Sequence, residues 1–189
     1  MPIAVPARAG TVLSCALRFI AMQLLVIRHA IAEEREVFAE TGEDDSLRPL
    51  TRRGERKMRE GVIGLRRVVP KLDVLAASPL VRAQQTAGIV AKAYGDIPVQ
   101  TARALTPDSE LPAAVRWLRQ QGEAKVVAIV GHEPHLGALV TWLMAGLEDS
   151  RISLRKGGAC LVEFSARPAA GGATLLWSLT PPQLRKIGR

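Results

Sequence analysis

Two of the three histidines in this 189-residue chain directly follow apolar runs, and one of the two is preceded by an arginine. His29 follows QLLVI and is preceded by Arg28, while His132 follows VVAIVG. A further cation, Arg82, stands four residues after Ser78 in SPLVRAQQTA. A neutral imidazole can attack phosphorus near pH 7 because its ordinary pKa is about 6.5. A guanidinium binds phosphate oxygens in a bidentate fork. These residue types therefore point to nucleophilic phosphoryl transfer.

The segments around these residues predict a sheet that would gather them at one edge. The short apolar runs are typical of parallel strands that are covered on both faces. We expect strands over 23–27, 74–77, 97–100 and 126–130, a hairpin of 159–165 with 173–179, and helices over 51–69, 78–94, 111–121 and 135–145. This order predicts an α/β fold, a three-layer α/β/α sandwich around a mainly parallel sheet. Ligands of such sheets bind beyond the carboxyl ends of the strands.

The predicted helix ends also bear on the site. Thr51 is a candidate N-cap, and Ser78 followed by Pro79 suggests a cap and first helical position. Arg82 then falls in a first helical turn, where the helix dipole disfavours a cation by about 0.3–1 kcal/mol. A bound dianion would reverse that preference, because the helix amides and Arg82 would both face negative charge.

Composition bounds the class of protein. Hydrophobic residues make up 48% of the chain and charged residues 23%, as in folded globular proteins. The net charge of +8 favours anionic partners. No five-residue Lys/Arg block occurs and aromatic residues are only 4%, so a nucleic-acid interface is not expected. Cys15 and Cys160 form no CxxC pair, and Cys160 reads as a buried structural thiol in a reducing cytoplasm.

The first 21 residues are interpreted separately from the rest of the chain. Their apolar stretch is interrupted by Arg18 and runs directly into the first expected strand, so it resembles neither a cleaved secretory signal nor a membrane span. We expect residues 1–21 to be a disordered or weakly helical extension, with Met22 as an alternative start. Residues 22–189 are expected to form a single domain.

The motifs LLVIRHA, SPLVRAQQTA and VVAIVGHEPHLG together resemble the histidine phosphatase superfamily, which includes the cofactor-dependent phosphoglycerate mutases. Within it, the chain is most similar to SixA-like phosphohistidine phosphatases. The features that carry this likeness are the small size, the RHA triplet, DSLRPLT at 45–51 followed by Gly54, and the short interval from Arg82 to His132.

This resemblance implies a phosphoglycerate mutase-like fold and a role for each matching residue. His29 would be the nucleophile, Arg28 and Arg82 would clamp the phosphoryl oxygens, and His132 would donate a hydrogen bond. Arg48 would bind substrate at the rim. The implied mechanism forms a phosphohistidine on His29, which water then hydrolyses. No cofactor or metal is expected, because the acidic run 43–45 has no paired His or Cys.

One departure from the family pattern concerns the proton donor. Mutases and many phosphoester hydrolases of the superfamily carry a Glu acid, often near a Trp-Glu-Gly signature, between the second Arg and second His. Residues 103–112 contain only Asp108 and Glu110, without that signature. An alkoxide leaving group needs a proton donor more than an imidazole does, so the departure favours P–N over P–O substrates. Asp45 and Glu133 remain candidate donors. His135 is expected to face outward or to pack against the strand end, without a site role.

The expected partner is a phosphorylated protein, such as a histidine-containing phosphotransfer domain, or a small phosphorylated molecule. A small-molecule phosphoester phosphatase or mutase of the same superfamily is the main alternative. A non-catalytic phosphate-binding module and a nucleic-acid-binding protein are weaker ones, the latter supported only by charge. We expect no nucleic-acid or membrane partner and leave the oligomeric state open.

Overall fold

A computed structural model describes residues 21–189 of the chain. The proposed N-terminal extension, residues 1–21, therefore lies outside the described residues except for Ala21. Among residues 21–189, no helix combines the length and apolar character that crossing a lipid bilayer requires.

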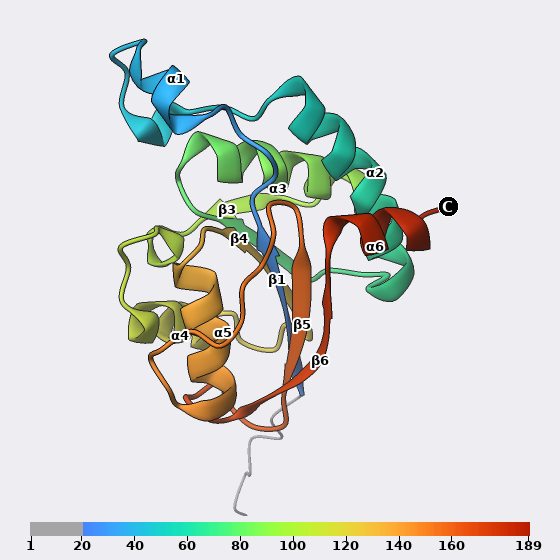
Figure 1. The fold of residues 1–189 in the computed structure, drawn as a ribbon. Coiled ribbons are helices and arrows are strands. Elements are labelled where there is room, and N and C mark those ends of the chain that lie inside the picture. The colour runs from blue at the N-terminus through green and yellow to red at the C-terminus, as the bar shows by residue number, and fades with distance from the viewer. Residues whose placement is uncertain (1–20) are drawn as a thin grey trace, which may run out of the picture.

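Within the described chain, six strands form one sheet in the order β3-β2-β4-β1-β5-β6 (Figure 1). The strands are β1 (Met22–Arg28), β2 (Val74–Ala77), β3 (Val99–Thr101), β4 (Val126–Gly131), β5 (Ala159–Phe164) and β6 (Ala173–Leu179). The first four run parallel, whereas β5 pairs antiparallel with both β1 and β6. The predictions of a mainly parallel sheet and of a terminal hairpin are confirmed.

Helices cover both faces of this sheet and complete the predicted three-layer sandwich (Figure 1). One layer contains α2 (Arg52–Val68), α3 (Val81–Ala93) and α6 (Pro181–Ile187). The opposite layer contains α4 (Leu111–Arg119) and α5 (His135–Ala145). The short helix α1 (Arg35–Ala39) and the 3-10 turns η1 (Asp45–Leu47) and η2 (Arg103–Leu105) lie in the connecting segments.

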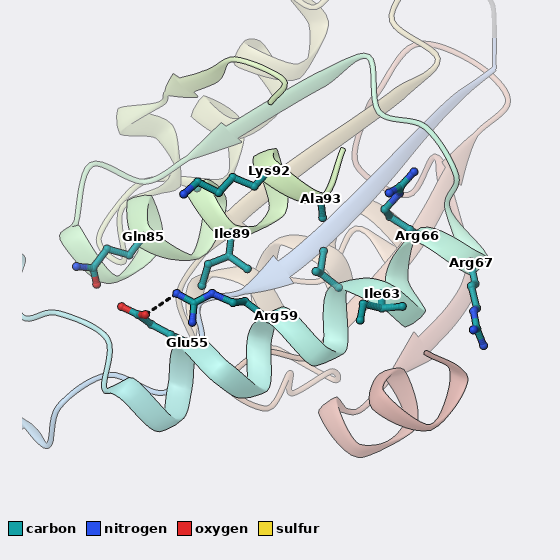
Figure 2. A pocket seen from close by; sticks show the side chains of 11 residues that line it. Glu55, Arg59, Ile63, Arg66, Arg67, Gln85, Ile89, Lys92 and Ala93 are labelled. Carbon is teal, nitrogen blue, oxygen red and sulfur yellow. Dashed lines mark hydrogen bonds and ion pairs between the residues drawn. The ribbon is translucent and has the colours of Figure 1, made fainter. Parts of the chain in front are cut away.

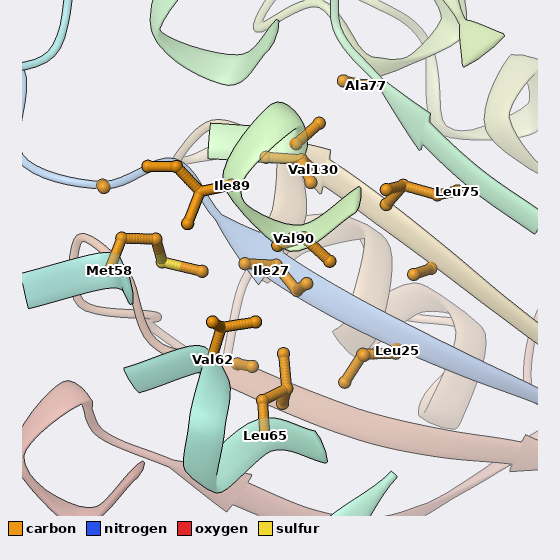
Figure 3. Packing of buried hydrophobic residues seen from close by; sticks show 14 of the residues in the cluster. Leu25, Ile27, Met58, Val62, Leu65, Leu75, Ala77, Ile89, Val90 and Val130 are labelled. Carbon is orange, nitrogen blue, oxygen red and sulfur yellow. The ribbon is translucent and has the colours of Figure 1, made fainter. Parts of the chain in front are cut away.

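The central strand β1 is apolar from Leu24 to Ile27 because both of its faces are buried. Leu25 and Ile27 pack against α2 and α3, while Leu24 and Val26 pack in the cluster that contains α4 and α5. Figure 3 shows the first of these clusters, with Leu25 and Ile27 facing Val62 and neighbouring side chains of α2 and α3. Both faces of β1 are buried from Leu24 to Ile27, so Arg28 and His29 lie at and just beyond its carboxyl end.

The start of α2 holds the segment that follows the nucleophile candidate. The Thr51 hydroxyl accepts a hydrogen bond from the Gly54 N–H at 2.9 Å, so the predicted cap is confirmed. The Thr51 N–H in turn donates to the Ile31 carbonyl at 3.0 Å. Any Cβ at position 54 would overlap that same carbonyl, so only glycine permits this close approach. The segment that follows β1 therefore packs in direct contact with the start of α2.

Several element boundaries differ from the predicted ones. Ser78 does not cap α3, because Leu80 is the N-cap residue and the helix begins at Val81. Arg82 nevertheless lies in the first turn, as predicted. The strand predicted over 97–100 covers Val99–Thr101 instead. The segment 33–48, for which no helix or strand was predicted, contains α1 and η1.

The helix α6 was missing from the prediction. Thr180 and Gln183 form its capping box, and its first two residues are prolines. Proline is compatible with a first helical turn, where backbone N–H groups have no partner within the helix. The pair of prolines therefore begins this helix rather than preventing it.

Candidate active site

A cavity of about 500 Å³ opens at the edge of the sheet where β1 and β4 end. Register explains why two histidines meet there: Ile27 pairs with Val130 and Arg28 with Gly131, so the residues that follow leave the sheet side by side. The walls include Arg28, His29, Arg48, Arg82, His132 and Glu133. Six of the seven residues predicted for the site thus line one cavity, and the seventh, Asp45, contacts Arg82.

The His29 ring is held in an orientation that suits a nucleophile. Nδ1 lies 2.7 Å from the Ala30 carbonyl oxygen, which can only accept, so Nδ1 carries the hydrogen and Nε2 keeps its lone pair. The Ala30 N–H donates to the Thr86 hydroxyl, and that hydroxyl donates to the Arg82 carbonyl. The backbone around His29 is therefore tied to the helix that carries Arg82.

The surroundings of His29 keep the imidazole neutral. The residue is only 5% exposed, and burial lowers the pKa of His29 to about 3. The hydrogen bond to Ala30 opposes this shift, whereas the charges of Arg82 and Arg28 add to it. Because only the neutral ring has a free lone pair, His29 stays available for attack across the ordinary pH range.

The His132 ring faces that of His29, with 5.1 Å between the ring centroids. Its Nε2 lies 2.9 Å from the Ser78 hydroxyl. Burial lowers the pKa of His132, and the neighbouring His29 and Arg82 add to this shift. Its Nδ1 is buried and has no hydrogen-bond partner. With the Ser78 hydroxyl donating to Nε2, Nδ1 carries the hydrogen and can donate it to an anionic oxygen.

Arg28 and Arg82 each have part of the guanidinium engaged and part free. Arg28 Nη1 donates to the Leu154 carbonyl at 2.7 Å. Arg82 Nη1 donates to the Asp45 carbonyl at 2.7 Å, and Arg82 Nη2 lies 3.1 Å from the Asp45 carboxylate. Burial lowers the pKa of both guanidinium groups, and a nearby carboxylate opposes the shift in each case. Both remain charged at neutral pH.

Buried polar atoms without partners are concentrated in these residues. In the part of the chain that the structure describes, five buried side-chain nitrogens lack a hydrogen-bond partner. Three of them are Arg28 Nε, Arg82 Nε and His132 Nδ1. Buried polar groups are normally satisfied, so three unsatisfied nitrogens in one predicted set indicate that an acceptor is missing. An oxyanion supplies acceptors and negative charge together.

The other two unpartnered nitrogens belong to His135. Its side chain is 4% exposed, so the outward-facing alternative for His135 is wrong and the residue packs inside the fold. His135 does not line the cavity that contains His29.

Asp45 binds three arginines at the mouth of the site. Its carboxylate is 2.7 Å from Arg48 Nε, 3.1 Å from Arg82 Nη2 and 3.6 Å from Arg35 Nε. Burial raises the pKa of Asp45, but the Arg48 hydrogen bond and the arginine charges outweigh this effect, and the net shift is downward. This environment argues against Asp45 as a proton donor, because the proton would have to displace these contacts. Arg48 lines the cavity while its Nε and Nη1 bind Asp45 and the Glu33 carbonyl.

Replacing Asp45 with Asn should strengthen the binding of inorganic phosphate. The Asp45 carboxylate occupies the Arg82 guanidinium that a phosphoryl group would use, and Asn removes its charge at nearly constant shape. We expect the inhibition constant of phosphate to fall roughly threefold to tenfold at low salt, a size typical of partly exposed ion pairs. Competitive inhibition measured at two ionic strengths tests this.

The matched control for that variant is Glu43→Gln. It removes the same charge from an exposed residue of the same segment. Phosphate binding that is unchanged or weaker in Asp45→Asn would show that the carboxylate orders the arginines rather than competing with the ligand.

Both oxygens of Glu133 accept hydrogen bonds from the backbone. Oε1 accepts from the Leu154 N–H at 2.7 Å, and Oε2 accepts from the Gly137 N–H at 3.3 Å. A backbone N–H can only donate, so both oxygens serve here as acceptors rather than as donors to a leaving group. The residues Asp108 and Glu110 are exposed and do not line the cavity.

Sequence reasoning missed several contributors to this site. Ser78 orients His132, Thr86 links His29 to α3, and Arg35 and Lys156 line the cavity. Lys156 precedes β5, which is antiparallel to β1, so its start lies at the edge where β1 ends. The N–H of Gly157 donates to the carbonyls of Arg28 and His29. The sequence predicts the hairpin but not the direction of its first strand relative to β1. An antiparallel assignment would have placed the loop before that strand at the catalytic edge.

The residues that the structure describes contain no group of three His, Cys, Asp or Glu side chains arranged to hold a metal ion. A larger cavity of about 830 Å³ lies between α2 and α3 (Figure 2). Its lining includes Ile63 and Ile89, and an ion pair of 2.7 Å joins Arg59 and Glu55 at one side. No histidine or cysteine lines this groove, so it offers no comparable nucleophile.

Comparisons with known proteins identify the family and the fold that this chain shares. The model of the "Histidine phosphatase superfamily (branch 1)" matches residues 24–106. An uncharacterized protein from Picosynechococcus sp. is 34% identical over 166 residues, which cover 86% of this chain and 98% of that protein.

Two solved structures illustrate the shared fold. One is the protein histidine phosphatase SixA complexed with tungstate, with a TM-score of 0.73, 24% identity and coverage of 86% of this chain and 99% of that chain. The other is a putative α-ribazole-5'-P phosphatase from Escherichia coli, with a TM-score of 0.67, 18% identity and coverage of 85% and 97%.

Proposed function

The chain belongs to the histidine phosphatase superfamily, whose members are phosphatases and mutases, and from this premise we propose that it removes phosphoryl groups from phosphohistidine in proteins. The observation that carries the catalytic part is the free Nε2 of a neutral His29 beside three unpartnered buried nitrogens of Arg28, Arg82 and His132. Together they offer a nucleophile and donors for an oxyanion.

The proposed reaction has two phosphoryl-transfer steps. The Nε2 lone pair attacks phosphorus while the bond between phosphorus and the substrate nitrogen breaks, and the leaving imidazole keeps that electron pair and takes a proton from solvent. Water then attacks the phosphorus on His29, which releases inorganic phosphate and restores the neutral ring. Arg28, Arg82 and His132 would stabilise the charge on the transferring group in both steps.

The proposed preference for a P–N bond is supported by the contacts that the two candidate proton donors make. Asp45 is bound by arginines, and both oxygens of Glu133 accept backbone hydrogen bonds. A phosphoester would release an alkoxide, which requires a positioned proton donor far more than an imidazole does. SixA, whose fold is similar, is described as a protein histidine phosphatase, and this is consistent with the proposal.

A comparison of substrates tests the proposal. Purified protein is incubated with a phosphotransfer domain phosphorylated on histidine and, separately, with a panel of phosphoesters that includes phosphoserine and sugar phosphates. We expect kcat/KM for the phosphohistidine protein to exceed that for every ester by at least about a hundredfold, the size of one general-acid contribution. Turnover of an ester with none of phosphohistidine would contradict the substrate assignment and support a small-molecule phosphatase.

A further inference from the structure

A second cavity of about 440 Å³ adjoins the catalytic one. Arg28 and Lys156 line both cavities, so one wall is shared. The remaining walls come from the residues after β1, from α2, from the loop before β5 and from α6. Four cationic side chains define what we call the basic subsite: Lys57, Arg155, Lys156 and Arg185. No carboxylate lines this cavity.

The positive charge of the basic subsite is poorly compensated. Arg185 lies 3.7 Å from Glu60, whose side chain is mostly exposed. Among the described residues, no ion pair involves Lys57, Arg155 or Lys156. Clefts lined by charges of one sign concentrate counter-ions, and cations gathered without a partner repel one another. An anion in the subsite would relieve this repulsion.

The loop before β5, which carries two cations of the basic subsite, is bonded to the backbone of the nucleophile. The N–H of Gly157 donates to the carbonyl of His29, and its backbone φ of 80° is one that other residues rarely adopt. Buried Met58 and the adjacent Pro181 form an apolar part of the wall. The backbone of the loop that carries Arg155 and Lys156 is therefore held at a set position relative to His29.

We propose that the basic subsite binds a second anionic group of the phosphorylated substrate while His29 attacks the phosphoryl group. The ligand chemistry is a carboxylate or phosphate group on the same molecule. This inference deepens the proposed function: in a phosphohistidine protein, the second anion is a Glu or Asp side chain near the modified histidine.

The α2–α3 groove differs from the basic subsite in two respects. Its basic rim includes Glu55, which pairs with Arg59, and it shares no lining residue with the catalytic cavity. Lys92 of this groove is exposed, and it lies on α3 within the same protein (Figure 2). Its removal changes the net charge by the same amount as removal of Lys57, away from the proposed subsite.

Binding of non-hydrolysable probes tests the subsite independently of substrate identity. Calorimetry compares methylphosphonate with bisphosphonates whose two phosphonate groups are separated by one to six methylene carbons. We expect one or more of the bisphosphonates to bind about tenfold tighter than methylphosphonate, as one added charge-assisted contact would provide. This ratio should fall toward one in Lys57→Ala/Arg155→Ala and persist in Arg59→Ala/Lys92→Ala, which likewise removes two positive charges, but at the α2–α3 groove.

Two results would overturn the inference. One is that no bisphosphonate in the series exceeds methylphosphonate in affinity, and the other is that the ratio survives in Lys57→Ala/Arg155→Ala. Because no turnover is involved, a failure of the phosphohistidine assignment leaves this measurement intact.

Steady-state kinetics with two peptides distinguishes a protein carboxylate from a small-molecule anion as the ligand of the basic subsite. Both carry phosphohistidine, one with flanking Glu residues and one with Gln in their place. A lower KM for the Glu peptide that depends on Lys57 and Arg155 assigns the subsite to protein carboxylates. Equal KM values together with tight bisphosphonate binding assign it to a phosphate or carboxylate of a small molecule and overturn the protein carboxylate.

Discussion

His29→Ala should reduce phosphatase activity by at least about 10⁴-fold, because loss of a covalent nucleophile leaves only binding and electrostatic effects. The structure gives this residue the features of a nucleophile: Nδ1 donates to the Ala30 carbonyl, Nε2 is free, and its pKa is lowered to about 3. No other histidine has the same arrangement, because His132 binds Ser78 through its Nε2. The loss should appear in kcat, measured on a phosphohistidine protein.

Labelling of the intermediate separates the role of His29 from a loss of folding. Rapid acid-free quenching with a radiolabelled substrate should trap label on His29 in the wild-type protein and none in His29→Ala. Circular dichroism and thermal unfolding show whether the variant keeps the fold. Label on another residue, or residual activity within tenfold of wild type, would contradict the mechanism.

The sequence was sufficient to place the two histidines together because their position depends on a simple rule. Apolar runs that need burial on both faces predict parallel neighbouring strands, and parallel strands end at one edge. The register of β1 with β4 then brings the residues after Arg28 and Gly131 side by side. Arg82 lies near them because it is in the first turn of α3, the helix that follows β2. Strand β2 pairs with β4, so this turn lies at the same edge of the sheet.

The contacts that tune the site could not be predicted in the same way. Ser78 and His132 are 54 positions apart, and the Asp45 carbonyl that binds Arg82 is 37 positions away from it. Such contacts depend on how the loops fold, and no periodicity describes a loop. Polar segment 33–48 contains the turn that carries Asp45, and a turn pattern alone does not indicate which cation its carboxylate will reach.

The direction of the last strands explains the missed basic loop. An alternating or apolar run predicts a strand and leaves its direction open. Because β5 runs antiparallel to β1, its first residues meet the catalytic edge, and Lys156 becomes part of the cavity wall. With the opposite direction, the same loop would lie at the far edge of the sheet.

Arg82→Gln should lower kcat/KM by about 10²–10³-fold, the size found when one preorganised donor to a developing oxyanion is removed. The Arg82 side chain is only 4% exposed, its Nε has no partner, and it opens α3 where the helix amides also favour an anion. Its charge is therefore poorly screened by water and acts on the transferring group at short range. Most of the loss should fall on kcat, because charge on the phosphoryl oxygens is redistributed in the transition state.

The control for this variant is Arg35→Gln. Arg35 lines the same cavity and lies 3.6 Å from the Asp45 carboxylate, but its side chain is 70% exposed. Solvent screens such a charge, so we expect a loss below about tenfold and a clear dependence on salt. Steady-state kinetics of both variants at low and high salt compare a buried and an exposed cation at one site. Equal losses in the two variants would mean that net positive charge, rather than the buried clamp of Arg82, drives phosphoryl transfer.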